Sequence, residues 1–486
     1  MRRVLPWLVD LPLLVAFVAL VHRLLITVRP RLTYPFDLEW MEGGMLVHAL
    51  RVSQGLPLYI EPSADWIPYL YPPLYPWLLG GLGLVTGVDY SVGRLVSLVG
   101  VGLASLALVA ALRREGGGPG LGLGAAALFL STYEDSGTFF DLVRADGLLV
   151  ALLGGALVLV RRGWLATGGL LLVLAFLAKH NAAAFGLPML GWLWWARGRG
   201  PALRFAAWSV LPALLVVGLL QWRSEGLFLV YLLEVPARHP FVLERFFPGA
   251  PRELLMAMPA AAVLVPLVPL LLRLRRAPAS PPDARQGAIY WALVGGLAFI
   301  LCMVMRGHHG GFLNVLVPGH WALALGASLA ALALRRAFPH PAVALLTSLL
   351  LAGQAWQARW EVAPQQPTQA DRLAGEALVE RLRNIEGEVL MPHSPWYPVL
   401  AGKAPSFPLI ALWDVDHGGR LSPFASRVDQ AIAARRWAAI ILPDGKLGHG
   451  LAEHYQVGDT VRYTGRAFYP KTGWPVRPRL VYLPKP

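Results

Sequence analysis

The sequence is poor in cysteine and in charged residues, and each shortage excludes a class of protein. Only one of the 486 residues is cysteine, Cys302, so the chain forms no intramolecular disulfide and contains no cysteine-rich metal module. Charged residues make up 15% of the chain, whereas an ordinary soluble protein has about 25%. The hydrophobic share is 56%, which excludes a disordered chain. The composition therefore fits neither an ordinary cytosolic enzyme nor a disordered protein.

The apolar residues are gathered in long runs. Runs of about 15 to 25 residues recur along the first three quarters of the chain, which is typical of a polytopic α-helical membrane protein. The first run lies at the N-terminus, where a signal peptide would be. It is too long for one and lacks a small-x-small cleavage site, so we expect an uncleaved span. The pattern predicts about eleven spans, near residues 4–28, 91–112, 119–133, 147–161, 164–179, 182–196, 203–222, 254–273, 287–305, 312–334 and 341–358.

Lysine and arginine outnumber aspartate and glutamate by 43 to 29. In a soluble protein this excess would suggest nucleic acid, but here it lies mostly in short loops, where it reports orientation. Several of these loops contain arginine pairs. They all fall on one side of the membrane if the run Tyr71–Gly87 does not cross it. This run is rich in proline and glycine, so we expect an outer juxtamembrane or re-entrant helix there. The N-terminus is then cytoplasmic and the C-terminus outside. These loops contain Arg113 and Arg114, Arg161 and Arg162, Arg197, Arg199 and Arg204, Arg273, Arg275, Arg276 and Arg285, and Arg335 and Arg336.

The composition changes after about Pro364, where charged residues become frequent and apolar runs shorten. The spacing predicts helices at Gln369–Asn384 and Ala425–Arg436 and short strands at Glu388–Met391 and Trp437–Leu442. We therefore expect a membrane domain over 1–360 and a small extracytoplasmic α/β domain over 365–486. No Gly-rich phosphate loop is present.

Acidic residues gather in two predicted outer loops. The first contains Asp37, Glu39 and Glu42, ahead of a predicted amphipathic helix, Gly43–Ser53. The second contains Asp146, at the head of the fourth span, with Glu134, Asp135, Asp141 and Arg144 before it. Carboxylates from two loops at one membrane face could provide a general base or hold a metal. The competing interpretation is that each is solvated or caps a helix, as Asp146 could.

Basic residues also occur at the predicted outer ends of spans, against the positive-inside trend. Lys179 and His180 lie between spans five and six, and Arg306, His308 and His309 lie between spans nine and ten. An anionic headgroup or a phosphate is the simplest reason for cations there. The alternative is snorkelling, or pairing with first-loop acids. Adjacent histidines are a weak signal for zinc.

The arrangement resembles the GT-C superfamily of membrane glycosyltransferases, in particular the protein O-mannosyltransferase and aminoarabinose-transferase branch (glycosyltransferase family 39-like). The resemblance covers roughly residues 1–330. It rests on the acidic first loop, the Tyr-Pro-Pro-Leu-Tyr run at 71–75, the Arg-Ala-Asp at 144–146 and the Asn-x-Leu-x-Pro segment at 314–318.

The resemblance implies an inverting transfer of a sugar from a polyprenyl-phosphate donor to an acceptor hydroxyl on the outer face. A first-loop acid would be the base. Where the family shows Asp-Glu, this chain has Met41-Glu42, so Glu42 is favoured, Asp37 is next and Glu39 stays open. Asp146 matches the second-loop acid. Lys179, His180 and Arg306, with Arg144, His308 and His309, would contact the donor phosphate. The family's Asp-x-Asp motif is absent, which leaves open whether a divalent metal takes part.

Other functions compete with this interpretation. A transporter or flippase should show two related halves with interrupted helices, and no such repeat stands out. A scaffold presenting the outer domain would leave the acidic loops without a role, and a lipid-linked polysaccharide ligase would not need them. We expect a bacterial inner-membrane enzyme whose partners are a polyprenyl-phosphate sugar and a lipid, glycan or protein acceptor, without nucleic acid. The sugar stays undetermined.

Overall fold

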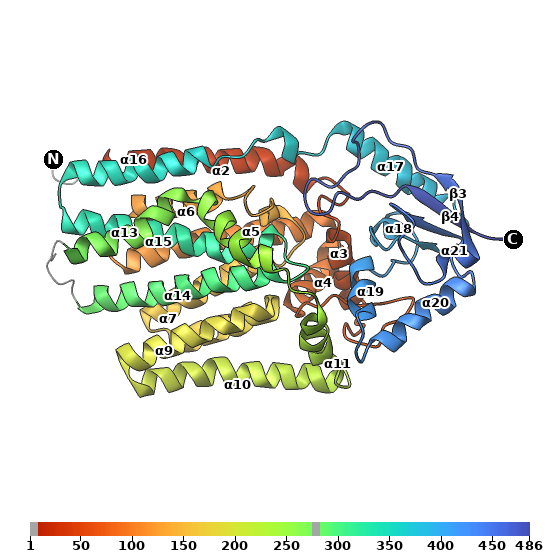
Figure 1. The fold of residues 1–486 in the computed structure, drawn as a ribbon, viewed down its shortest axis with the longest axis horizontal. Coiled ribbons are helices and arrows are strands. Elements are labelled where there is room, and N and C mark those ends of the chain that lie inside the picture. The colour runs from red at the N-terminus through yellow and green to blue at the C-terminus, as the bar shows by residue number, and fades with distance from the viewer. Residues whose placement is uncertain (1–7, 275–281) are drawn as a thin grey trace.

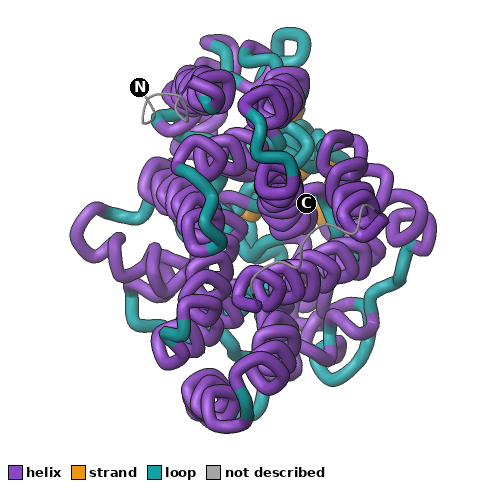
Figure 2. Tube along the Cα trace, turned by 90° about the vertical axis from the view of Figure 1, so that its left-hand side faces the viewer, coloured by secondary structure: helices purple, strands orange, loops and turns teal. Residues whose placement is uncertain are grey.

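The computed structural model describes residues 8–274 and 282–486. The first residues of the first predicted span and the predicted loop residues Arg275 and Arg276 lie outside them. Eleven helices form an elongated bundle at the positions of the eleven predicted spans (Figures 1 and 2). They are α2 (Leu11–Leu32), α5 (Tyr90–Arg114), α6 (Pro119–Ser131), α7 (Asp146–Arg162), α8 (Leu165–Ala178), α9 (Gly186–Arg197), α10 (Arg199–Arg223), α13 (Pro259–Leu274), α14 (Pro282–Gly307), α15 (Val317–Ala337) and α16 (Pro341–Gln357).

Not all of these helices have the length of a full crossing. Five helical segments among the described residues, at α2, α5, α10, α14 and α15, are long and apolar enough to cross a membrane. A sixth arises if Arg245–Ala257 and Pro259–Leu271, which meet at 92°, form one broken span. Helix α6 has 13 residues, about 20 Å at 1.5 Å per residue, whereas a bilayer core is about 30 Å thick. The helices are thus confirmed as elements, and the number of crossings stays a prediction.

The outer faces of the bundle are apolar, as lipid contact requires. Helix α10 buries only Ala202 and Phe205, and it exposes leucines such as Leu215, at 73%. A helix that is hydrophobic all round, with most of its surface exposed, needs an apolar solvent. The chain is therefore a polytopic α-helical membrane protein.

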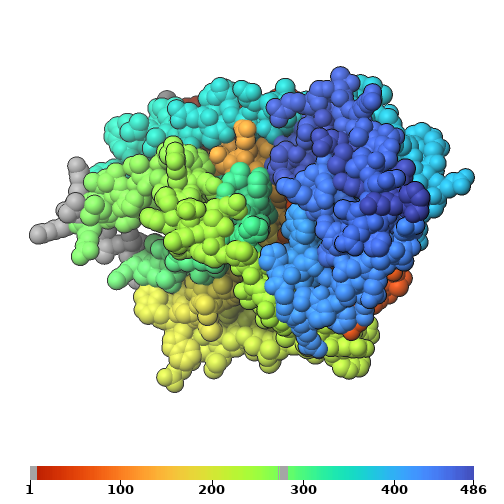
Figure 3. Space-filling view, turned by 45° about the vertical axis from the view of Figure 1, so that its right-hand side comes forward, coloured from red at the N-terminus to blue at the C-terminus, as the bar shows by residue number. Residues whose placement is uncertain are grey.

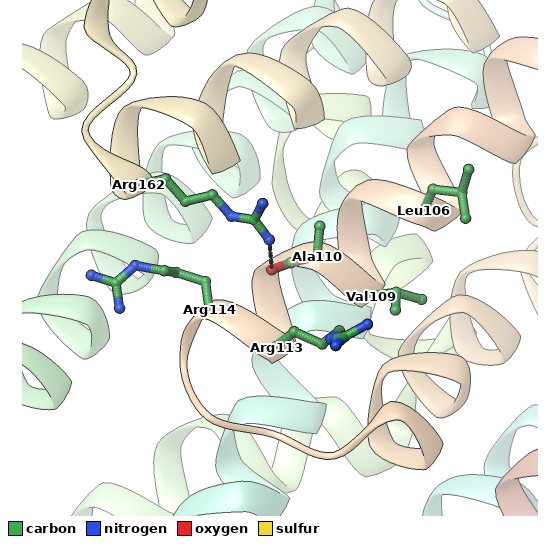
Figure 4. A pocket seen from close by; sticks show the side chains of 6 residues that line it. All are labelled: Leu106, Val109, Ala110, Arg113, Arg114 and Arg162. Carbon is green, nitrogen blue, oxygen red and sulfur yellow. Dashed lines mark hydrogen bonds between the residues drawn. The ribbon is translucent and has the colours of Figure 1, made fainter.

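The predicted arginine loops lie at one end of the bundle. Asp283 makes ion pairs with Arg114, Arg161 and Arg197, which come from three different loops. Arg162 of the same end donates to the carbonyl of Ala110 over 3.2 Å, beside a shallow hollow lined by arginines (Figure 4). These contacts place Arg114, Arg161 and Arg197 at one end of the bundle, and that this end lies on one side of a membrane stays a prediction.

The opposite end of the bundle contains two short helices, α3 (Glu42–Ser53) and α4 (Leu74–Thr86), which pack against each other. Both occur where the sequence predicted outer helices. Gly80 of α4 allows this close packing, because a Cβ there would lie 2.6 Å from Cγ1 of Val52 in α3. Gly44 of α3 allows the loop before α4 to approach, because a Cβ there would lie 1.9 Å from the hydroxyl of Tyr69. Helix α4 has 13 residues, the same length as α6, so its juxtamembrane position stays a prediction.

Short elements link the bundle helices at this same end and nearby. They are the 3₁₀ turns η1 (Phe139–Asp141), η2 (His180–Phe185), η4 (Pro236–Arg238), η6 (Leu313–Leu316) and η7 (Ala363–Gln365), the π turns η3 (Val230–Glu234) and η5 (Arg245–Gly249), and the short helices α11 (Leu227–Leu229) and α12 (Ala250–Ala257). Several of these turns position the candidate site described below.

The C-terminal region is a small α/β unit. Its sheet has the order β1-β2-β4-β3, in which β1 (Val389–Leu390) is parallel to β2 (Ala439–Leu442), and β4 (Leu480–Pro484) runs antiparallel to both β2 and β3 (Tyr455–Thr460). The predicted strands and helices at β1, β2, α17 and α20 are confirmed; β3 and β4 had no clear sequence signal. The helices are α17 (Gln369–Arg383), α18 (Tyr397–Leu400), α19 (Leu409–Asp416), α20 (Ser426–Ala433) and α21 (Leu451–His454), with the 3₁₀ turn η8 (Ser422–Ala425).

This α/β region packs across the end of the bundle that holds α3 and α4 (Figures 1 and 3). One hydrophobic cluster runs from Leu46 of α3 and Tyr75 of α4 to Phe407 and Ile440 of the α/β region. The two regions therefore share a core, and the loops between them are enclosed.

Candidate active site

The two predicted acidic loops meet at the end of the bundle that faces the α/β region. Arg31 of α2 makes a fully buried ion pair with Asp141 of η1, with Nε and Oδ2 2.6 Å apart. The same guanidinium donates to the carbonyls of Gln365 and Thr138. This pair joins the second loop to the end of α2, from which the first loop starts. Glu39 lies close enough to Glu42 and Asp146, and Asp37 to Glu42, for their charges to interact.

Glu42 is held on all sides. It begins α3, has no exposed surface, and makes a two-pronged ion pair with Arg94 of α5 at 3.0 and 2.8 Å. Its oxygens also accept from the backbone amides of Leu38 and Val143. Buried charges are stable only when paired and hydrogen-bonded in this way. Glu42 therefore joins the two loops and α5, and none of its oxygens faces an open side.

Glu39 and Arg144 link the first loop to the head of α7. Arg144 Nη1 lies 3.3 Å from Glu39 Oε2, and Nη2 donates to the hydroxyl of Tyr71 over 3.1 Å. Burial raises the pKa of Glu39 to about 7; Arg144 opposes this shift and the nearby carboxylate of Glu42 adds to it. Glu39 thus titrates near neutral pH, which distinguishes it from ordinary glutamates.

The Asp146 carboxylate, at the start of α7, contacts side chains from two other segments. Its Oδ1 lies 2.5 Å from Nζ of Lys179, at the end of α8, and accepts from Nδ2 of Asn314 in η6 over 3.0 Å. Its Oδ2 is buried without a hydrogen-bond partner. Asp146 makes no side-chain cap, so its carboxylate positions an amine and an amide rather than the helix end. The structure brings together three residues that the sequence had placed in separate loops.

Asp37 is the acid of this group that has no cation in contact. Its Oδ1 accepts from the hydroxyl of Tyr90 over 2.8 Å and from the amide of Gly43 over 2.9 Å, and its Oδ2 is buried with no partner. Burial raises its pKa well above the ordinary 3.8, and the neighbouring Glu42 carboxylate raises it further. A carboxylate with one oxygen fixed and the other unpartnered is oriented and still able to accept a proton.

The remaining predicted basic residues divide into two groups. His180 and Asn181 lie beside Lys179, and the His180 Nδ1 and Asn181 Oδ1 atoms are buried without partners. Burial, with smaller contributions from Lys179 and His308, lowers the pKa of His180 to about 4, so its ring is neutral at pH 7.

Arg306, by contrast, is engaged by protein groups. Its guanidinium makes two 2.8 Å hydrogen bonds to Glu253 of α12 and one to the carbonyl of Gly311. His308 faces the carbonyl of Pro236 and the ring of His239. The backbone carbonyl of His309 accepts from Arg245. These residues join the loop after α14 to the loop after α10, and the Arg306 guanidinium is already paired with Glu253.

Two residues of the site were missed by the sequence analysis. Arg94 and Tyr90 lie at the start of α5 and contact Glu42 and Asp37. The available signal was the arginine itself, because a charge four residues into an apolar run is costly in lipid and marks a function or a partner.

The carboxylates do not form a metal centre in this arrangement. Across residues 8–274 and 282–486, no three histidine, cysteine, aspartate or glutamate side chains are placed to share a metal ion. Glu42, Glu39 and Asp146 are each neutralised by a cation of the chain. The mechanism proposed below uses the chain's own groups.

Comparison with known proteins identifies the fold. No protein-family model matches the chain, and no curated protein matches it. Two solved structures of ArnT from Cupriavidus metallidurans are similar to it, one bound to undecaprenyl phosphate (TM-score 0.57) and one in the apo state (TM-score 0.55). Each is 16% identical to this chain, and the match covers 96% and 97% of this chain and 97% of each ArnT chain. The chain therefore has the GT-C-like fold that the resemblance implied.

Proposed function

We propose that this chain is an integral membrane glycosyltransferase that moves a sugar from a polyprenyl-phosphate carrier to an acceptor hydroxyl, with Asp37 as the general base. The observation that carries the proposal is Asp37 itself, a buried carboxylate with an unpartnered oxygen, in a chain with a GT-C-like fold. The lipid carrier is inferred from the similarity to ArnT, which binds undecaprenyl phosphate.

Asp37 suits this role better than Glu42, the residue that the sequence favoured. Glu42 binds Arg94 and two backbone amides, so protonating it would leave a buried guanidinium unpaired. Asp37 is oriented only by neutral donors, Tyr90 and Gly43. A raised pKa makes its carboxylate a stronger base for a hydroxyl proton. Glu39, which also has a raised pKa, is bound to Arg144 and serves to position that cation.

The donor phosphate would contact Arg144, Lys179 and His180. Arg144 offers a planar guanidinium next to the hydroxyl of Tyr71, a geometry that matches phosphate oxygens. Lys179 is held by Asp146, and the neutral ring of His180 can donate one hydrogen bond. Such fixed cations stabilise the negative charge that grows on a leaving phosphate. Arg306, His308 and His309 would contribute by shaping the neighbouring loop.

The reaction balances without a cofactor. The acceptor oxygen forms a bond to the anomeric carbon while the bond from that carbon to the phosphate oxygen breaks. The hydroxyl proton passes to Asp37, and the lipid phosphate leaves with the bonding electron pair. A single displacement inverts the anomeric centre. Since the sugar arrives on a lipid, no nucleotide-binding fold is needed at this face, which we place outside the cytoplasm of a bacterial inner membrane.

Consumption of the donor tests this function. The full chain would be reconstituted in nanodiscs with undecaprenyl phosphates carrying glucose, mannose or arabinose, together with bacterial membrane extract as the acceptor. We expect release of undecaprenyl phosphate from one donor, reduced at least tenfold in Lys179→Ala. The matched control for loss of a cation is Arg223→Ala, because Arg223 is exposed at the end of α10. Equal release by wild type, Lys179→Ala and a protein-free nanodisc would contradict the proposal.

A further inference from the structure

The edge of the small sheet that faces the acidic loops has the form of a ligand-binding edge. Strands β1 and β2 are parallel, so their carboxyl ends lie at the same edge. His393 comes three residues after β1 ends at Leu390, and Asp444 comes two residues after β2 ends at Leu442. Ligands of open α/β sheets bind outside the carboxyl ends of parallel strands.

Trp413 and Trp474 lie beside His393 at this edge, and Trp40 packs against Trp474. The ring of Trp474 lies 5.3 Å from that of Trp40, 5.7 Å from that of Trp413 and 5.5 Å from that of His393, measured between centroids. Trp474 is 37% exposed, and Trp40 and Trp413 are partly exposed. The rings come from three segments far apart in the sequence: the first acidic loop, α19 and the segment before β4. We call these four residues the aromatic cluster.

The aromatic cluster adjoins the candidate active site. Trp40 follows Glu39 directly, and a Cβ placed on Gly473 would lie 3.1 Å from Oε1 of Glu39. The amides of Lys471 and Thr472 both donate to the carbonyl of Leu38. The segment that carries Trp474 is therefore tied to the loop that contains Asp37 and Glu39.

His393 has unused hydrogen-bonding capacity. It is 4% exposed, and neither of its ring nitrogens has a partner. Burial lowers its pKa to about 4, so at neutral pH one nitrogen donates and the other accepts. A sugar hydroxyl also both donates and accepts. Buried polar atoms are normally satisfied, so these nitrogens indicate a ligand that brings its own polar groups.

We propose that Trp40, Trp413, Trp474 and His393 bind a sugar ring beside the acidic loops. Pyranose rings present an apolar face of C–H bonds and an edge of hydroxyls. The negative faces of aromatic rings attract such C–H groups, and a few polar groups among aromatic walls fix orientation. This inference rests on the proposed function and extends it, because it gives the α/β region a role in recognising the transferred sugar or a sugar of the acceptor.

Binding of defined sugars by the full chain in nanodiscs tests this site. The donor probes are undecaprenyl phosphate and its glucose, mannose and arabinose derivatives, and the acceptor probe is an array of immobilised bacterial glycans. The variants are Trp474→Ala, Trp474→Phe and His393→Gln, and the control is Trp222→Ala, a 75% exposed tryptophan on α10. Thermal melting of each variant shows whether it is folded.

We expect Trp474→Ala to weaken sugar-dependent binding about tenfold, as truncation of an aromatic anchor commonly does. Trp474→Phe should keep most of the sugar-dependent binding, and His393→Gln should lose part of this binding. The control Trp222→Ala should bind as wild type does. Loss confined to the lipid-linked sugars assigns the cluster to the donor, and loss confined to the array assigns it to the acceptor.

Two results would overturn the inference. The first is that the wild-type protein binds no sugar-bearing probe more tightly than the sugar-free counterpart of that probe. The second is that the Trp474→Ala variant is folded and binds every probe as tightly as wild type does. Binding of undecaprenyl phosphate itself should be unchanged in all variants. If wild type fails to bind undecaprenyl phosphate while Trp474→Ala loses glycan binding, the proposed function fails and the sugar site stands.

Discussion

The acidic residues of the candidate site differ in whether their carboxylates contact a cation. Glu42, Glu39 and Asp146 are in contact with Arg94, Arg144 and Lys179 respectively. Asp37 contacts a phenol and a backbone amide instead. Removing one partner of a buried ion pair leaves an uncompensated charge, whereas neutralising Asp37 leaves none.

This difference predicts opposite effects for two conservative substitutions. Glu42→Gln should lower the free energy of unfolding by about 3–5 kcal/mol, because Arg94 stays buried without a counter-charge. Asp37→Asn should melt near the wild-type temperature and lose a factor of about 10²–10⁴ in transfer rate, since it removes only the base. Thermal melting and initial rates on both variants check this. A stable, inactive Glu42→Gln would return the base to Glu42.

The pKa of Asp37 sets the pH at which activity begins. Protonated Asp37 cannot accept a proton, so kcat/KM should fall as the pH drops through its raised pKa, well above 3.8. The hydrogen bond from Tyr90 lowers that pKa. Tyr90→Phe should therefore move the acid limb to higher pH while activity at alkaline pH persists. A pH–rate profile that Tyr90→Phe leaves unmoved, or moves to lower pH, would contradict this assignment.

For individual residues, the sequence indicated which acids belong to the candidate site better than it indicated the role of each acid. It indicated Asp37, Glu39, Glu42 and Asp146 as a group, and the structure places them in one neighbourhood. The family resemblance favoured Glu42, because sequence alone does not show that Arg94 of α5 pairs with it. Which acid is neutralised depends on three-dimensional pairing between segments that lie 33 to 105 residues apart in the sequence.

At the scale of elements, α5 and α7 position both acidic loops through an unusually close contact. A Cβ on Gly100 of α5 would lie 2.5 Å from the backbone carbon of Gly147, and one on Gly147 would lie 2.4 Å from the carbonyl oxygen of Ser97. Small residues allow helix backbones to approach this closely in membranes. The contact lies one residue from Asp146, so it fixes the head of α7.

Gly100→Ala should therefore push α7 away from α5. We expect a loss of about 1–3 kcal/mol in stability from overpacking, with lower activity because Asp146 and Lys179 shift. Gly102→Ala, on the same helix but with no atom within 4 Å of its added Cβ, is the matched control and should be neutral. Melting temperatures of the two variants in one detergent decide the matter. Equal melting would show that the contact is not tight.

The helical elements were predictable because their apolar runs are long and bounded by arginines, prolines and glycines. Strands β3 and β4 were not, since β3 exposes most of its residues and lacks an apolar pattern. The crossing count stays a prediction for a physical reason: α6, α8 and α9 are short and are stabilised by packing within the bundle, so length alone does not fix their depth.

At the scale of the whole molecule, the shared core between bundle and α/β region requires both to assemble at one membrane face. Arginine loops occupy the opposite end, which the positive-inside rule predicts to be cytoplasmic. The native Cys302 is buried, at 2% exposure, so introduced cysteines can report the orientation with little background.

Thr464→Cys, exposed in the α/β region, should react with a membrane-impermeant maleimide in intact spheroplasts. Trp164→Cys, between α7 and α8 and 65% exposed in wild type, should react only after lysis. Mass-tag labelling on a gel measures both. The reverse pattern would place the acidic loops in the cytoplasm and would exclude the proposed outer-face reaction.

The central claim is that a polyprenyl-phosphate sugar is transferred with Asp37 as the base. The most direct measurement is transfer of radiolabelled sugar from undecaprenyl-phosphate donors into membrane acceptors by wild type, Asp37→Asn and Asp37→Glu at matched expression. We predict transfer by wild type, loss of at least a hundredfold in Asp37→Asn and partial recovery in Asp37→Glu, in which a carboxylate is retained. Full transfer by a folded Asp37→Asn protein would contradict the account.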